Sequence, residues 1–284
     1  MQVVSAIADV RAAVAAAREA NARIGFVPTM GALHDGHLSL VERSRRESDV
    51  TVMSIFVNPL QFGPKEDLAR YPRPVEADEK LASEAGVDIL FRPDVEDMYA
   101  SDRSVTVVAG ELGSQWEGTS RPGHFDGVLT VVAKLFNIVT PDIAVFGRKD
   151  LQQAALVGAM VRDLDMPVSI VVAPIVREED GLALSSRNRY LTDEERARAR
   201  VLSAALASIV EKFRDGERSV AALEETGRSK IASEPLVTID YLAVVDDATF
   251  LRPKQAVEGN AAIVAARVGK TRLIDNMILG RDKD

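Results

Sequence analysis

The sequence of 284 residues contains no cysteine. The absence of thiols excludes disulfide bonds, thiolate metal ligands and cysteine nucleophiles, and it agrees with a reducing environment. Long apolar runs are also absent, because none reaches the roughly 18–20 residues that a membrane-spanning helix needs. The N-terminal stretch MQVVSAIADVRAAVAAAREANA has no basic leader and an alanine-rich helical pattern, so it predicts a first helix and no signal peptide. We therefore expect a cytoplasmic protein that does not associate with a membrane.

A surplus of positive charge is missing too. The chain has 35 Lys and Arg against 43 Asp and Glu, a formal net charge of −8, and no long basic block. Because nucleic-acid binding draws much of its affinity from phosphate contacts, we expect no nucleic-acid partner. The pattern G-x-x-x-x-G-K-[ST] does not occur, which excludes a P-loop. Local basic pockets for a phosphorylated small molecule remain compatible with this balance.

The first part of the sequence does contain a regular alternation of strand-like and helical patterns. Apolar runs at 23–28, 49–57, 87–91, 142–146 and 168–173, with a further candidate at 105–109, alternate with helical periodicity at 37–48, 75–85, 125–139 and 149–165. This alternation predicts an α/β fold with a doubly wound parallel sheet and helices on both of its faces.

Beyond about residue 186 the pattern changes. Helical periodicity at 192–214 and 220–233 precedes strand-like runs at 238–245 and 261–268. Thr192 followed by acidic residues is typical of a capped helix start. We therefore expect two domains, residues 1–186 and a smaller α+β domain of residues 187–284.

Two of the three histidines lie in the stretch PTMGALHDGHL, residues 28–38, between a predicted strand and its helix. In doubly wound sheets ligands bind beyond the carboxyl ends of the strands. His34 and His37 are three residues apart, so a helical turn puts both imidazoles on one face, near a helix N-terminus that attracts anions. The pattern predicts a phosphate site. A helix cap with two incidental histidines remains an alternative, and a zinc pair is disfavoured because no further histidine or cysteine lies nearby.

Two more polar groups follow predicted strands. In FGRKDLQQ, residues 146–153, Lys149 suits a phosphate and Asp150 a ribose hydroxyl, with Gln153 on the same helical face. In REEDGLALSSRN, residues 177–188, two serines and an arginine are typical of a phosphate-contacting loop. Each group has a simpler interpretation: Asp150 could cap its helix beside a solvated lysine, and the serines could form a turn or a cap.

Two apolar segments carry amides and the third histidine. In FVNPLQF, residues 56–62, Asn58 and Gln61 lie among hydrophobic residues, which suits a small hydroxylated organic acid. The stretch RPGHFDG, residues 121–127, leads into a predicted helix. A lone histidine such as His124 is more often structural than catalytic.

Together these stretches, with TRLIDN at 271–276, resemble the pantoate–β-alanine ligase family, in which similar motifs occur in the same order. The resemblance implies a Rossmann-like nucleotidyltransferase domain of the H-x-G-H class, a smaller C-terminal domain and a homodimer. It also implies a reaction in two steps. The carboxylate of pantoate attacks the α-phosphate of Mg-ATP to give pantoyl adenylate and pyrophosphate, and the amine of β-alanine then displaces AMP.

The resemblance also implies roles for the residues that match the family motifs. These are catalysis by His34, His37 and Lys149; ATP binding by Met30, His37, Gly147, Arg148, Lys149, Asp150, Val176, Leu184, Ser185, Ser186 and Arg187; pantoate binding by Met30, Gln61, Val131, Val132 and Gln153; and a β-alanine path past Asn58 and Gln61. Mg²⁺ is implied as the partner of ATP, without an assigned ligand residue. Residues 66–73 resemble a lid, and Arg148 stands where the family more often has an uncharged or acidic residue.

Other functions remain open on the sequence alone. The same H-x-G-H site could adenylate a different small acid, although such an enzyme would not need both Gln61 and Gln153. A relative of tRNA synthetases would need a basic surface, which the net charge of −8 argues against. A catalytically silent binding protein with the same fold is the third alternative.

Overall fold

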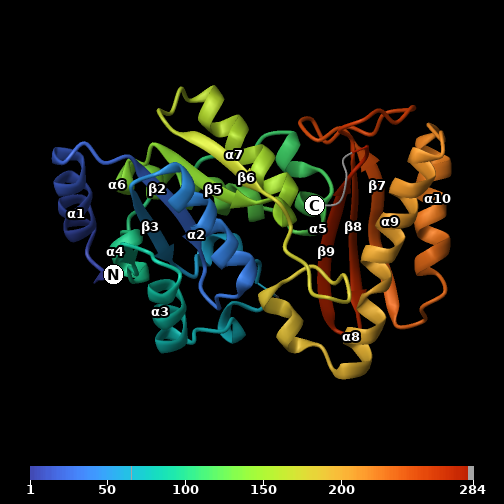
Figure 1. Cartoon of the computed structure of the whole chain (residues 1–284), viewed down its shortest axis with the longest axis horizontal. Helices are drawn as coiled ribbons and strands as arrows, with labels where there is room; N and C mark the ends of the chain where they lie inside the picture. Colours follow the sequence, from blue (N-terminus) through green and yellow to red (C-terminus); the bar gives the residue numbers. More distant parts are fainter. Residues whose placement is uncertain (65, 281–284) are drawn as a thin grey trace. The chain divides into compact units, whose positions relative to one another are not determined.

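The computed structural model describes residues 1–64 and 66–280, and its contacts divide the chain into two compact units (Figure 1). Unit 1 contains Met1–Ser114, Arg121–Arg148 and Leu156–Ala173. Unit 2 contains Gln115–Ser120, Lys149–Ala155 and the chain from Pro174 onward. The division into domains 1–186 and 187–284 stays a prediction. Among the described residues, no helix combines the length and the apolar character that crossing a membrane requires.

Unit 1 is built on six parallel strands in the order β1-β4-β3-β2-β5-β6. The strands are β1 (Gln2–Val4), β2 (Ile24–Thr29), β3 (Val50–Ile55), β4 (Ile89–Phe91), β5 (Ile143–Gly147) and β6 (Ser169–Ala173). From β2 the chain proceeds to one side through β3 and β4, and later to the other side through β5 and β6. The strand order therefore reverses between β2 and β5, which is where doubly wound sheets bind ligands. The predicted α/β class is confirmed.

Alternate residues of β2 face opposite layers of helices. Val27 belongs to a core cluster that includes Leu40 of α2 (Asp35–Glu47) and Ala82 of α3 (Val75–Glu84). Phe26 instead packs edge-on against Phe136 of α6 (His124–Val139), with ring centroids 6.4 Å apart. Helix α1 (Ile7–Glu19) packs on α6 on that same face. Because both faces are covered, the strands are apolar almost throughout, as the sequence indicated.

One local expectation for unit 1 was wrong. Residues 105–109 form no strand, and Val105 and Val108 are 77% and 70% exposed. Valines favour strands only when neighbouring strands and a core cover them, and this segment has neither. Strand β1 was not predicted because it has three residues beside an alanine-rich helical pattern. The helix expected over 149–165 consists of the short helix η4 (Arg148–Asp150) and α7 (Leu151–Asp163).

Unit 2 contains an antiparallel sheet of β7 (Val237–Val245), β8 (Ala261–Val268) and β9 (Thr271–Ile278), in that order. Helices α9 (Val201–Arg214) and α10 (Val220–Ile231) share its core. The α+β prediction is confirmed. The helix start predicted at Thr192 is also correct: Thr192 and Glu195 form a reciprocal capping box at α8 (Asp193–Ala199).

The remaining elements are short. They are α4 (Val95–Met98), α5 (Glu117–Ser120), η1 (Pro59–Gln61), η2 (Leu68–Arg70), η3 (Leu112–Ser114) and η5 (Ser186–Tyr190). Strand β9 follows β8 after a tight turn and was not predicted, because its polar residues Arg272, Asp275 and Asn276 interrupt the apolar pattern.

Candidate functional site

The loop that joins β2 to α2 is held by a buried carboxylate. Asp78 of α3 is 2% exposed, and its two oxygens accept hydrogen bonds from the backbone N–H groups of Ala32 and Leu33, both at 2.8 Å. Gly31 has a φ of 81°, and a Cβ at this position would lie 2.9 Å from Asp78 Oδ2. The loop therefore needs glycine at 31 and an acceptor at 78. Asp78 was not predicted as a functional residue, because its position is that of an ordinary acidic residue in the first turn of a helix.

His34 and His37 lie together at the start of α2, with ring centroids 4.1 Å apart. His34 is the N-cap residue: its Nδ1 accepts a hydrogen bond from the backbone N–H of Gly36 at 3.2 Å. Because that N–H can only donate, the proton of the neutral His34 ring lies on Nε2. The cap interpretation is therefore confirmed for His34, and it leaves a donor on the other ring nitrogen. The described residues form no group of three or more metal-ligating side chains.

The end of β5 carries the next predicted residues. Gly147 is the last residue of β5, and Arg148 is a buried residue that begins η4. Both belong to unit 1, as do Met30, His34 and His37. They follow the carboxyl ends of β2 and β5, the two strands between which the strand order reverses. The predicted roles of these residues stay predictions.

In unit 2, residues Val176 to Leu184 fold back on themselves as a hairpin. Leu184 N–H donates to the carbonyl of Val176 at 3.0 Å, and Glu178 N–H donates to the carbonyl of Leu182 at 2.9 Å. Directly after the hairpin, Ser185 Oγ accepts from the backbone N–H of Arg187 at 3.3 Å and caps η5. The structure thus brings the predicted serines and arginine together on one short helix start.

The dipeptide Asp275–Asn276 of β9 holds two of the predicted segments of unit 2. Asp275 forms a bidentate ion pair with Arg177 at 2.8 and 2.9 Å, and Arg177 also donates to the carbonyls of Gly181 and Asn276 at 3.1 Å. Asn276 Nδ2 donates to the carbonyl of Lys149 at 3.1 Å. One strand therefore fixes both the hairpin and the backbone of Lys149. No local pattern in the sequence indicates these contacts beyond the motif itself.

The third predicted segment of unit 2 is the first turn of α7. Gln153 is half-buried there, while the neighbouring Gln152 is buried and structural. Gln152 Oε1 accepts from the backbone N–H of Glu117 at 3.2 Å, and its Nε2 donates to the carbonyl of Gln115 at 2.9 Å. Asp150 is exposed, and its predicted contact with a ribose stays a prediction.

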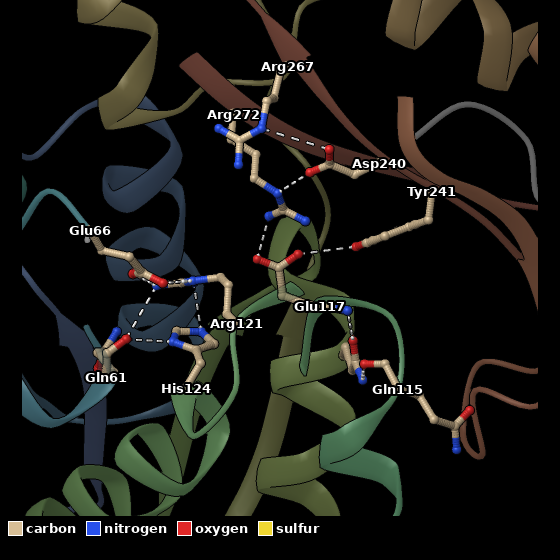
Figure 2. A network of polar contacts seen from close by, with 11 residues as sticks. Gln61, Glu66, Gln115, Glu117, Arg121, His124, Asp240, Tyr241, Arg267 and Arg272 are labelled. Carbon is tan, nitrogen blue, oxygen red and sulfur yellow. Dashed lines mark hydrogen bonds and ion pairs between the residues drawn. The ribbon is translucent and has the colours of Figure 1, made fainter. Parts of the chain in front are cut away.

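A partly buried ionic network, drawn in Figure 2, anchors α5 to the sheet of unit 2. Arg272 of β9 donates to Glu117 at 2.7 Å and to Asp240 at 2.6 Å. The hydroxyl of Tyr241 donates to Glu117 at 3.3 Å. Burial, and then the neighbouring carboxylate of Glu117, raise the pKa of Tyr241 above its ordinary value, so the phenol keeps its proton. This network was not predicted, because Glu117 lies more than a hundred positions from Tyr241 and Arg272 along the chain.

In unit 1, Gln61 lies at the end of η1, against the start of α6. Its Oε1 accepts from Asn58 Nδ2 at 3.0 Å. Its backbone carbonyl accepts from His124 Nδ1 at 2.9 Å and from Arg121 Nη2 at 3.3 Å (Figure 2). Val131 and Val132 are buried on α6. The two amides that the sequence singled out are thus in direct contact, and the third histidine touches the same turn.

The fold and these arrangements define the class of the protein. Unit 1 is a Rossmann-like parallel sheet whose strand order reverses between β2 and β5. A histidine pair lies at the N-terminus of α2, directly after β2. Unit 2 contains a small antiparallel sheet. The chain belongs to the pantoate–β-alanine ligase family, whose sequence model matches residues 2–278. The resemblance drawn from the motifs is thereby confirmed.

Individual relatives agree with the family. The chain is 52% identical over 285 residues to pantothenate synthetase of Agrobacterium fabrum, covering 100% of this chain and 97% of the relative. It superposes on the crystal structure of pantothenate synthetase from Thermus thermophilus with a TM-score of 0.93 at 52% identity, covering 98% and 99% of the two chains. A Francisella tularensis pantoate–β-alanine ligase, complexed with β-γ ATP and β-alanine, superposes with a TM-score of 0.79 at 34% identity and covers 98% and 97%.

Proposed function

We propose that this protein condenses pantoate with β-alanine to form pantothenate, with ATP converted to AMP and pyrophosphate. Family membership over residues 2–278 supports the reaction, and a relative whose structure holds β-γ ATP and β-alanine supports the two ligands. The observation in this chain that carries the proposal is the pair His34–His37 at the N-terminus of α2. Two imidazoles at a helix N-terminus suit an anion whose charge grows during the reaction.

The first step transfers the adenylyl group. A carboxylate oxygen of pantoate attacks the α-phosphorus of ATP, and the bond from that phosphorus to the bridging oxygen breaks, so that pyrophosphate leaves with the electron pair. In our proposal His34, His37 and Lys149 stabilise the negative charge on the transferring phosphate and on the leaving pyrophosphate. Ser185, Ser186 and Arg187 bind further phosphate oxygens.

The second step transfers the pantoyl group. The unprotonated amine of β-alanine attacks the acyl carbon of the adenylate, the carbon–oxygen bond to AMP breaks, and the amine loses a proton. Neither step needs a covalent bond to the protein, which is consistent with a sequence without cysteine. The protein acts by positioning its substrates and by stabilising charge.

The remaining ligand contacts belong to the same proposal. Gly147, Arg148, Asp150, Val176 and Leu184 contact the nucleotide, and Met30, Gln61, Val131, Val132 and Gln153 contact pantoate. Asn58 and Gln61 border the path of β-alanine. Residues 66–73 form a lid that closes over the substrates. Each role rests on the match of these positions to the family motifs.

We further propose that magnesium enters with ATP, and that the protein is a cytoplasmic homodimer. Because the described residues form no cluster of three or more carboxylates or imidazoles, they provide no complete cage for a cation. Mg²⁺ commonly binds through phosphate oxygens and water with few protein ligands, so the phosphates of ATP would supply its main contacts.

The proposed function is tested by isotope exchange. With pantoate and Mg-ATP but no β-alanine, labelled pyrophosphate should enter ATP, because adenylate formation is reversible; β-alanine should then release AMP. A panel of other short hydroxy acids serves as the control and should support little exchange. Absence of exchange would count against the two-step reaction, and equal exchange with every acid would count against pantoate as the substrate.

A separate prediction concerns Gln61. Gln61→Ala is expected to raise the KM for pantoate about 10–100-fold, since a hydrogen bond to a charged group contributes roughly 1.5–3 kcal/mol. The KM for ATP should change far less. Steady-state kinetics with each substrate varied in turn measures both constants, and Gln255→Ala, an exposed glutamine of unit 2, is the matched control. An equal rise in both constants would contradict a pantoate contact.

A further inference from the structure

The turn η1, which carries Gln61, packs on α6 so closely that only glycine fits at the contact. A Cβ at position 127 would lie 2.3 Å from the carbonyl oxygen of Leu60 and 2.6 Å from the backbone nitrogen of Gln61. Both neighbours are backbone atoms, so neither can move aside as a flexible side chain could. The position of Gln61 relative to α6 is therefore set by a direct backbone contact.

Asn58 fixes the turn through its side-chain amide, which is 1% exposed. Its Nδ2 donates to the carbonyl of Gly127 and to Gln61 Oε1, both at 3.0 Å. Its Oδ1 accepts from the backbone N–H of Leu60 at 3.2 Å and from the hydroxyl of Tyr99 at 2.8 Å. Because a carbonyl only accepts and a backbone N–H only donates, the orientation of this amide is unambiguous. Both hydrogens and both lone pairs of Asn58 are used inside the protein.

The phenol of Tyr99 keeps the role of donor in this arrangement. Burial raises the pKa of Tyr99 above its ordinary value, and the nearby guanidinium of Arg103 opposes the rise without cancelling it. The hydroxyl therefore stays protonated at neutral pH and donates to Asn58 Oδ1.

The fixed amide of Asn58 in turn fixes the amide of Gln61. Since Asn58 presents a hydrogen to Gln61, the atom of Gln61 that faces it must be the oxygen Oε1. The nitrogen Nε2 is then the other end of the amide, and no described residue accepts a hydrogen bond from it. Gln61 is thus oriented to donate to a ligand and not to accept from one.

His124 and Arg121 hold the same turn from its backbone side (Figure 2). His124 Nδ1 lies 2.9 Å from the carbonyl of Gln61, and Nε2 lies 3.0 Å from Arg121 Nη1. A carbonyl only accepts and a guanidinium only donates, so His124 must be neutral, with its proton on Nδ1. Arg121 is itself held by Glu66, with distances of 2.9 and 2.6 Å to the two carboxylate oxygens. Arg121 and Glu66 are thus the charged groups of this cluster.

We propose that Asn58, Arg121 and His124 are positioning residues that hold Gln61 with its Nε2 toward the substrate, so that the site recognises an acid that offers acceptor oxygens. The inference rests on the proposed function, because it takes Gln61 as a contact of pantoate. It gives His124, which the sequence indicated only as structural, a defined protonation state: neutral and protonated on Nδ1.

Two substitutions of His124 separate positioning from mere packing. His124→Phe fills the space but has no donor, and it is expected to raise the KM for pantoate about 5–10-fold, the effect of losing one hydrogen bond of roughly 1–1.5 kcal/mol. His124→Asn places an N–H near the former Nδ1 and is expected to recover most of the affinity. The KM for ATP should stay within about twofold in both variants, since neither removes a phosphate contact.

The dependence on pH gives a second readout. Protonation of His124 would set an N–H against the guanidinium of Arg121, so acidic pH that charges the ring should raise the wild-type KM for pantoate. His124→Asn has no such group, and its KM should rise less. His34 and His37 are present in both proteins, so their contribution cancels in the comparison.

The tautomer can also be observed in the unaltered protein. Nitrogen NMR of the ¹⁵N-histidine-labelled protein near pH 8 should show His124 neutral and protonated on Nδ1, and His124→Asn assigns the signal. An Nε2-protonated or charged ring would overturn the inference, as would equal pantoate KM values for His124→Phe and the wild type. If instead the wild type shows no pantoate-dependent pyrophosphate exchange, the proposed function fails, whereas the NMR result still tests the positioning geometry.

Discussion

Lys149→Ala is expected to slow pantoate-dependent exchange of pyrophosphate into ATP about 10²–10³-fold, the usual loss when one group that stabilises transition-state charge is removed. The lysine is half-buried in η4, directly after β5, and its carbonyl is fixed by Asn276 at 3.1 Å. That backbone contact survives the substitution, so the fold should persist. His37→Ala is expected to have an effect of similar size for the same reason.

The matched control for Lys149→Ala is Lys80→Ala. The side chain of Lys80 is 75% exposed and forms only a surface ion pair with Glu84, so exchange should continue at the wild-type rate. His34 requires more care, since His34→Ala would also remove a helix cap; His34→Asn keeps a capping side chain. Near-normal exchange by Lys149→Ala, with thermal unfolding unchanged, would refute the catalytic role of the lysine.

The second large effect is expected for Asp275→Ala. The carboxylate is 4% exposed and makes a bidentate ion pair with Arg177, so its removal leaves a guanidinium facing an empty, largely buried site. Breaking a buried pair in this way typically costs about 3–5 kcal/mol. The loss should appear in the free energy of unfolding of unit 2, and the KM for ATP should rise because the hairpin before Ser185 loses its anchor.

The fluorescence of a single tryptophan can measure the loss of unfolding free energy expected for Asp275→Ala. Trp116 is the only tryptophan of the sequence, and within unit 2 it contacts Tyr241, with ring centroids 5.7 Å apart, and donates to the carbonyl of Phe250 at 2.9 Å. Its fluorescence during denaturant titration therefore reports on unit 2. Arg198→Ala, which breaks the pair with Glu234 within unit 2 and removes a side chain that is 46% exposed, is the control and should cost less than about 1 kcal/mol. A similarly small loss for Asp275→Ala would contradict the structural importance of the pair.

Local signals in the sequence were enough for most of the fold. The strands β2, β3 and β5 are covered on both faces, so their continuous apolar runs identify them in the sequence. The capping box at Thr192 involves residues only three positions apart. The strand predicted at 105–109 does not form, because β-branched side chains do not make a strand without a neighbouring strand to pair with. Strand β9 forms although it was not predicted, because its polar residues are buried by contacts that no local pattern indicates.

The candidate site was predictable in part for the same reason. The histidine pair, the two serines at the start of η5 and the two amides at the ends of η1 each lie within one turn, so their spacing predicted their proximity. The residues that hold these groups did not stand out. Asp78 binds a loop 45 positions away, and Arg177 finds Asp275 98 positions away, contacts that depend on the completed fold.

The distance along the chain between Arg177 and Asp275 has a consequence for the newly made protein. Asp275 is added 98 residues after Arg177, and Asn276 is added 127 residues after Lys149. At a synthesis rate of about 5–20 residues per second, roughly 5–25 s pass before Arg177 and Lys149 can meet these partners. During that interval Arg177 must remain hydrated or find a temporary partner. The order of translation thus makes the anchoring of the hairpin a late event in the maturation of the enzyme.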